Sequence, residues 1–289
     1  MNGGALRMPA DAGALRMSDV LTEQRGPARW IVMSRPVRRN ALTLAVIDAL
    51  HAALRSCLID DDVRAIVLAG SRPAFSAGLD LHEVRALHAG NDRPHPLVAA
   101  LVDLLHDVQT GGKPVIACVA GVAAAGGAAL SAACDVVVAG RSARIGYPGI
   151  RRGLSAPIVG HVLIPQVGLR RAKYLVLTGR LLGAEEALRL GLVDEVVDDE
   201  RLEERVTQIA ESLAELNPAA VAASKRMLNA AAAAPGRSPA TPGSSTAALG
   251  GSALVRGNSA AAPGRGGDSS SPSGPQGLRL WLSSLRHEP

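Results

Sequence analysis

Two short loops rich in glycine and alanine are the part of the sequence best suited to chemistry. They are Ala74-Phe-Ser-Ala-Gly-Leu-Asp80 and Gly121-Val-Ala-Ala-Ala-Gly-Gly127, and each follows an apolar stretch and leads into a helical pattern. Small side chains leave main-chain N–H groups uncovered, and a helix N-terminus adds partial positive charge to them. Two such N–H groups that converge on one oxygen would stabilise an oxyanion.

A purely structural role is the alternative for both loops. Glycine-rich connections between a strand and a helix are common, and they often serve only tight turns or close packing. Neither loop is a Walker A loop, because no Gly-Lys-Ser/Thr follows, and neither matches the GxGxxG nucleotide pattern. Taken singly, each loop favours the packing role, so evidence for chemistry has to come from the flanking residues.

The elements around these loops predict an α/β protein. Short apolar runs indicate buried strands, and segments with helical periodicity follow them. Strands alternate with helices in the first half of the chain, and helices dominate later. We expect strands at 30–33, 63–69, 115–119 and 135–139, and helices at 43–58, 97–108, 128–134, 156–164, 168–177, 184–189, 200–215 and 218–232.

Composition excludes several classes of function. Aromatic residues make up only 2% of a chain that is 47% hydrophobic, which argues against a nucleic-acid binder that stacks bases on exposed rings. The formal charge of +5 is a weak signal, since residues 231–289 carry five Arg against one Asp and one Glu and so supply +3 of it. No continuous apolar run of about 18 residues is present, so we expect no membrane span. Cys57, Cys118 and Cys134 lack CxxC spacing, which predicts buried free thiols and a reducing, cytoplasmic location.

With their flanks, the two loops resemble the enoyl-CoA hydratase/isomerase (crotonase) family. The resemblance covers about residues 19–230, with the motifs in the family's order. The matching stretches are Ser34-Arg-Pro-Val-Arg-Arg-Asn-Ala-Leu42, Val63-Arg-Ala-Ile-Val-Leu-Ala-Gly70, Phe75-Ser-Ala-Gly-Leu-Asp-Leu81, Lys113-Pro-Val-Ile-Ala117, residues 121–135, Leu175-Val-Leu-Thr-Gly-Arg180 and Ala184-Glu-Glu-Ala-Leu-Arg-Leu-Gly-Leu-Val193.

This resemblance implies an α/β, crotonase-like spiral of ββα units with a C-terminal helical region, assembled as a homotrimer or hexamer. It implies that the main-chain N–H groups of Leu79 and Gly126 form an oxyanion hole for the carbonyl of an acyl-CoA thioester. Coenzyme A enters as part of the substrate, so we expect no separate cofactor and no metal. The substrate contacts implied in the same way are Arg38, Ala41, Ala77, Gly78, Leu79, Asp80, Gly126, Gly127 and Pro148.

Some of these residues also have a simpler interpretation. Arg35, Arg38 and Arg39 can form a solvated charge run, which we favour for Arg39. Asp80 is better suited to capping the following helix than to touching substrate.

The sequence departs from the family's hydratases at both catalytic carboxylates. Those enzymes carry one glutamate three residues after the oxyanion glycine and another after the proline of a later strand–turn. Here the two positions are Ala129 and Gly149. Hydration needs a base for water and an acid for the α-carbon, and each such group contributes about 10²–10⁴-fold. Neither Ala129 nor Gly149 can supply a proton or accept one.

Other residues near the loops are weaker candidates for proton transfer. Tyr147 is expected to pack in the core, His82 and Glu83 to lie on an exposed helix face, and Ser155 to cap a helix. Three functions therefore stay open: an acyl-CoA lyase or isomerase, a catalytically silent acyl-CoA-binding protein, and an oligomeric interaction protein in which the loops only pack.

The chain divides into four expected segments. Residues 1–18 form a disordered extension, 19–200 the spiral core, 201–232 a truncated helical region and 233–289 a disordered tail. Of residues 231–289, 39 of 59 are Ala, Gly, Ser or Pro, a composition that buries too little apolar surface to fold. A frameshift after about residue 230 is one hypothesis for this abrupt change.

Overall fold

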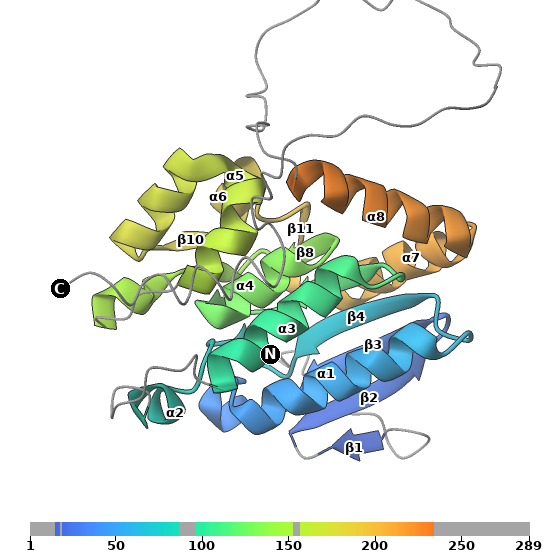
Figure 1. The fold of residues 1–289 in the computed structure, drawn as a ribbon, viewed down its shortest axis with the longest axis horizontal. Helices are drawn as coiled ribbons and strands as arrows, with labels where there is room; N and C mark the ends of the chain where they lie inside the picture. The colour runs from blue at the N-terminus through green and yellow to red at the C-terminus, as the bar shows by residue number, and fades with distance from the viewer. Residues whose placement is uncertain (1–14, 18, 87–95, 153–156, 234–289) are drawn as a thin grey trace, which may run out of the picture.

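A computed structural model describes residues 15–17, 19–86, 96–152 and 157–233, and the fold within them is a repeated unit (Figure 1). Three times, a long strand is followed by a short strand and then by helix, which is the ββα repeat of the crotonase fold. The units are β4 (Ala65–Gly70), β5 (Ala74–Ser76), α2 (Leu81–Ala86) and α3 (Pro96–Thr110); β6 (Val115–Val119), β7 (Val122–Ala124) and α4 (Gly126–Ala133); and β8 (Val136–Gly140), β9 (Arg144–Gly146) and α5 (Pro157–Thr178).

The long strands form a seven-stranded sheet in the order β1-β2-β3-β4-β6-β8-β11. The ladder is antiparallel from β1 to β3 and parallel from β3 onward. Every residue of β4 and β6 is buried, which explains why the sequence shows continuous apolar runs there instead of alternation. The remaining strands of this sheet are β1 (Leu15–Met17), β2 (Val20–Arg25), β3 (Ala28–Met33) and β11 (Glu195–Val197).

Helices cover both faces of this sheet and create two apolar cores. On one face α7 (Leu202–Ala214) packs against β3, β4, β6 and β8, and buries Trp30, Val67 and Val206 between them. On the other face lie α1 (Leu44–Ile59), α3 and α4, with the larger core beneath them (Figure 1). Thr43 caps α1 as predicted, since its side chain accepts the Val46 N–H at 3.2 Å.

The short strands form a second sheet, in the order β10-β9-β7-β5, with β10 at Leu181–Gly183. The chain passes from the first sheet to the second within two or three residues, which demands unusual backbone. Gly121 has φ +66°, and a Cβ there would lie 2.1 Å from the Pro73 carbonyl oxygen, so only glycine fits. This crossing places the ends of β5 and β7 side by side, because the two strands pair in parallel.

The last helices close the fold. They are α6 (Ala184–Leu190), α7 and α8 (Pro218–Ala233). The buried Lys225 ties α8 to the core: its Nζ donates to Asp135 Oδ2 at 2.6 Å and to the Val108 carbonyl at 2.8 Å. Within the described ranges, no helix is long and apolar enough to cross a membrane.

Several expectations from the sequence need correction. The prediction that residues 1–18 lack structure is wrong for Leu15–Met17, which pair with β2; a three-residue strand is too short to show a period. The segment 121–127 is not simply a loop, because it contains β7. Strands β2, β5, β9, β10 and β11 also went unpredicted, most of them only three residues long. Residues 1–14, 18 and 234–289 lie outside the described residues, and the proposed disorder there stays a prediction.

Candidate active site

The two glycine-rich loops meet where β5 and β7 end. A Cβ built on Gly126 would lie 3.5 Å from the Leu79 nitrogen, and one built on Gly78 would lie 2.9 Å from the Gly126 nitrogen. The Leu79 and Gly126 amides, 47 positions apart in the sequence, therefore lie close together at the ends of β5 and β7. A side chain at Gly78 or Gly126 would crowd these amides.

Hydrogen bonds on the far side of the first loop fix how Leu79 faces. Leu42 N donates to the Gly78 carbonyl at 2.8 Å, and Asp80 N donates to the Leu42 carbonyl at 2.9 Å. Because successive N–H groups of extended chain point to opposite sides, the Leu79 N–H points away from Leu42. In the part of the chain that the structure describes, this N–H donates to no protein acceptor.

Among the described residues, the Gly126 N–H also donates to no acceptor. Gly126 is the first residue of α4, and the first N–H groups of a helix have no partner inside it. Ala125, at the cap position, has no side-chain acceptor to offer, and its own N–H donates to the Gly146 carbonyl at 2.9 Å. Ala125 has φ +49°, a region that non-glycine residues rarely occupy. The start of α4 is therefore held in a strained turn, a feature that is common at functional sites.

A buried asparagine, to which the sequence assigned no role, supports the first loop. Asn40 is fully buried with φ +52°. Its Oδ1 accepts from Arg35 N at 2.8 Å and Ser71 Oγ at 3.2 Å, and its Nδ2 donates to the carbonyls of Ser71 at 2.8 Å and Ala74 at 2.6 Å. All four hydrogen-bonding positions of the amide are thus used. The signal available in the sequence was an asparagine beside two arginines before an apolar run, too common to single out.

Replacing Asn40 with alanine is expected to destabilise the protein by about 3 kcal/mol or more. The change leaves several buried donors and acceptors unpaired, at about 1–3 kcal/mol each, and puts alanine in left-handed backbone. Urea unfolding would measure the loss. Asn40→Asp would set a buried carboxylate oxygen against the Ser71 and Ala74 carbonyls, so its loss should be at least as large, and the exposed neighbour variant Arg39→Ala serves as the control. Equal midpoints for Asn40→Ala and wild type would show that the network does not hold the loop.

The arginines beside the loop differ in exposure: Arg35 is half-buried, and Arg38 and Arg39 are exposed. Arg35 donates to the Ala41 carbonyl at 2.8 Å and pairs with Asp19 at 2.9 Å and with Asp80 at 3.6 Å. The interpretation of Arg35 as part of a solvated charge run is therefore wrong, because these partners hold it against the loop. Arg38 and Arg39 are exposed, in keeping with the prediction for Arg39.

The cap predicted at Asp80 is present. Its Oδ1 accepts the His82 N–H at 3.0 Å at the start of α2. Glu83, expected on an exposed face, instead accepts the Leu44 N–H at 2.9 Å and so joins α2 to the first turn of α1. His82 is exposed as predicted, and Ser155 lies outside the described residues.

The two positions at which the resemblance places the hydratase glutamates hold small side chains in different elements. Ala129 is fully buried on α4, three residues after Gly126. Gly149 is half-buried in a 3-10 helix, Pro148–Arg152, that follows β9. Tyr147 lies just before it and packs in the core as predicted, with its hydroxyl buried and, among described atoms, without a hydrogen-bond partner. Burial raises the pKa of Tyr147, so the phenol stays protonated and cannot act as a base at neutral pH.

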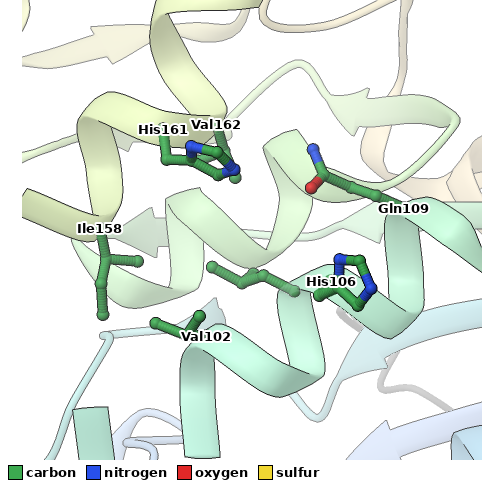
Figure 2. A pocket seen from close by; sticks show the side chains of 7 residues that line it. Val102, His106, Gln109, Ile158, His161 and Val162 are labelled. Atoms are coloured by element: carbon green, nitrogen blue, oxygen red, sulfur yellow. The ribbon is translucent and has the colours of Figure 1, made fainter. Parts of the chain in front are cut away.

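A small cavity is lined by residues of α3 and α5 (Figure 2). Helix α4 contacts both of these helices. Four of its lining residues follow one stripe of α3 at positions 102, 105, 106 and 109, and three follow one stripe of α5 at 158, 161 and 162. Apolar side chains make up most of the wall, with His106, Gln109 and His161 as the polar part. No sequence pattern indicates this cavity, because it depends on how the two helices cross.

All three cysteines are buried free thiols, as the sequence predicted. Among the described residues, no group of three or more His, Cys, Asp or Glu side chains is placed to hold a metal ion.

Comparison with known proteins gives a consistent result. The family model described as enoyl-CoA hydratase/isomerase matches residues 27–240. A Clostridium acetobutylicum protein named short-chain-enoyl-CoA hydratase is 30% identical over 217 residues, which is 74% of this chain and 82% of that protein. The mitochondrial enoyl-CoA hydratase domain-containing protein 3 of Danio rerio is 33% identical over 224 residues, 78% of this chain and 76% of that one.

Solved structures agree with the sequence comparison. The crystal structure of an enoyl-CoA hydratase/isomerase from Xanthobacter autotrophicus Py2 superposes with a TM-score of 0.71 at 33% identity. The match covers 75% of this chain and 80% of that one. The crotonase arrangement of two sheets and trailing helices is thus shared in three dimensions.

Proposed function

The chain belongs to the enoyl-CoA hydratase/isomerase family, and on that premise we propose that it binds an acyl-CoA thioester and stabilises the thioester enolate. The Leu79 and Gly126 N–H groups would hold the carbonyl oxygen. The observation that supports this proposal is that the two amides lie close together and that neither donates to a protein acceptor among the described residues. Fixed donors aimed at developing charge are often the largest single contribution to catalysis.

The remaining contacts of the substrate follow from the same site. The segment Ala77–Asp80, with Gly127 and Pro148, would line the thioester and pantetheine part. Arg38, exposed one residue before the strained Arg39–Asn40 turn, would meet the phosphates of coenzyme A, for which a guanidinium is well suited. Ala41 lies next to the Leu42–Gly78 hydrogen bond and would contact the nucleotide. Coenzyme A is part of the substrate, and no further cofactor is proposed.

Without carboxylates at positions 129 and 149, the site can bind an acyl-CoA thioester but lacks the groups for rapid hydration. A backbone oxyanion hole still polarises the thioester carbonyl, but without an acid and a base near the α- and β-carbons hydration loses about 10²–10⁴-fold for each missing group. We therefore propose an acyl-CoA enzyme of the lyase or isomerase type whose hydratase rate is low. A protein with the same site and no turnover at all would be a silent acyl-CoA-binding protein. Assembly as a homotrimer and a cytoplasmic location stay predictions.

Titration calorimetry with the full chain tests the proposal. Crotonyl-CoA should bind at least about tenfold more tightly than free coenzyme A, because the carbonyl adds roughly 1.4 kcal/mol of hydrogen bonding in the oxyanion hole. Equal affinities would place the adenosine end alone in a site and contradict the oxyanion hole. No binding of either compound would favour the interaction-protein alternative, in which the loops only pack.

A further inference from the structure

Ser76, the last residue of β5, is a fully buried serine whose hydroxyl both donates and accepts a hydrogen bond. Its Oγ donates to the Asn40 carbonyl at 2.8 Å and accepts the Gly78 N–H at 3.2 Å. A nucleophilic serine needs a base to take its proton, and the proton of Ser76 is directed at a main-chain carbonyl, which is no base. The hydroxyl is therefore suited to orienting its neighbours and not to attacking a substrate.

The bond from Ser76 holds the residue that comes directly before the Leu79 amide. Gly78 has φ +87°, a backbone conformation that favours glycine. Its N–H is held by Ser76 Oγ, and its carbonyl accepts the Leu42 N–H at 2.8 Å. The Gly78 carbonyl and the Leu79 N–H belong to one planar peptide unit. The two hydrogen bonds on Gly78 therefore set the direction in which the Leu79 N–H points.

Ser76 also packs against the start of α4, which carries the Gly126 amide. A Cβ built on Gly127 would lie 2.4 Å from the Ser76 carbonyl oxygen and 2.7 Å from the Ser76 Cβ. The backbone of α4 thus approaches Ser76 more closely than any residue but glycine would allow. Ser76 is also paired with Ala123 in the ladder between β5 and β7. Ser76 therefore contacts both segments that supply the proposed oxyanion hole.

We propose that Ser76 is a positioning residue for the oxyanion hole. Its hydroxyl links the Asn40 carbonyl to the Gly78 N–H, and this link aims the Leu79 N–H at the oxygen that the Gly126 N–H also meets. Ser76 acts through Gly78 and not on the substrate itself. The inference rests on the proposed acyl-CoA function and adds to it the side chain that aligns one donor. Hydrogen bonds weaken steeply as they bend, so a loop without this link would keep the donor and lose part of its effect.

The variant Ser76→Ala tests this inference, because it removes the hydroxyl and keeps the Cβ that packs on Gly127. Calorimetry compares crotonyl-CoA with free coenzyme A. The preference for crotonyl-CoA should fall from about tenfold in the wild type to about threefold or less, since only the hydrogen bond from Leu79 is weakened. The affinity for free coenzyme A should not change. Infrared spectra of crotonyl-CoA labelled at the carbonyl carbon give a second readout: binding should lower the carbonyl stretching frequency less in the variant than in the wild type.

Two further variants separate alignment of the donor from the loss of any buried hydroxyl. Ser131 is a second buried serine, and its Oγ donates to the Ala128 carbonyl at 3.0 Å within α4. Ser131→Ala is the matched control and should keep both the preference for crotonyl-CoA and the carbonyl frequency. Ser76→Cys restores a side chain of similar shape that is a weak donor and a weak acceptor, so it should recover part of both.

The possible failures are distinguishable. If the wild type shows neither the preference nor the lowered carbonyl frequency, the proposed acyl-CoA site fails, and the inference fails with it. If the wild type shows both and Ser76→Ala keeps both, or loses affinity equally for the two ligands, the inference is overturned and the oxyanion hole stands. Circular dichroism melting shows whether each variant is folded. If Ser76→Ala does not fold, Ser76→Cys decides, and full preference with an unchanged carbonyl frequency in that variant overturns the inference.

Discussion

The Gly126→Pro variant is expected to lose about 10²–10³-fold in kcat/KM for crotonyl-CoA, the usual cost of removing one oxyanion-hole donor. Proline removes the N–H of Gly126, places its ring Cδ where that hydrogen was, and restricts the backbone of the preceding Ala125. Gly126 is the first residue of α4, a position where proline is well tolerated because its N–H has no partner inside the helix. The added Cβ would lie about 3.3 Å from Leu101 Cδ2, and that side chain can shift.

A second variant separates the loss of the N–H donor from the effect of an added Cβ. Gly126→Ala introduces the same Cβ and keeps the N–H, so it should retain much more activity than Gly126→Pro. Binding of crotonyl-CoA by calorimetry gives the same comparison independently of turnover. Similar losses in the two variants would mean that bulk, not the donor, matters at this position. No loss in either would remove Gly126 from the site.

The second large effect is a gain. Ala129→Glu combined with Gly149→Glu is expected to raise crotonyl-CoA hydration by at least about 10²-fold, because one acid–base group alone contributes about 10²–10⁴-fold. Ala129 is fully buried on the first turn and a half of α4, and burial raises the pKa of a carboxyl, which favours a general acid. Gly149 is only half-buried, so a carboxylate there stays ionised more readily and suits the base.

The double glutamine variant is the control for this gain. Ala129→Gln with Gly149→Gln has nearly the same volume and polarity but cannot transfer a proton, so it should stay at the wild-type rate. Spectrophotometric loss of the enoyl thioester measures all three proteins, with melting temperature and acyl-CoA affinity recorded alongside. A folded double glutamate variant that binds crotonyl-CoA but hydrates it no faster would show that the side chains at 129 and 149 do not face the reacting carbons.

Part of the fold and of the candidate site could be predicted from local sequence. The buried strand at 115–119 has the bounds expected from its apolar run, and Thr43 caps α1 as a threonine before a helical pattern should. Strand-to-helix loops made of glycine and alanine have few conformations and exposed amides, so their chemistry could be inferred from residue type alone. The absence of carboxylates at Ala129 and Gly149 is also a fact of sequence, and no fold can restore them.

Short elements and long-range contacts could not be predicted. Strands β7 and β9 are three residues long, too short for a period to appear, and they form only because their parallel neighbours supply hydrogen-bond partners. The role of Arg35 follows from Asp19 and Asp80, which the fold brings to it. Asn40 is decisive because the carbonyls of Ser71 and Ala74, more than 30 residues away, turn toward its amide.

The sequence by itself determined the chemistry available to this protein: uncovered amides on two loops, and no carboxylate at the two expected positions. These depend on residue type and near neighbours, which the chain carries whatever its fold. Only the tertiary structure decided that the Leu79 and Gly126 amides lie close together and that His106 and His161 line one cavity. Their proximity depends on strand pairing and helix crossing, and those are set by packing across the whole core.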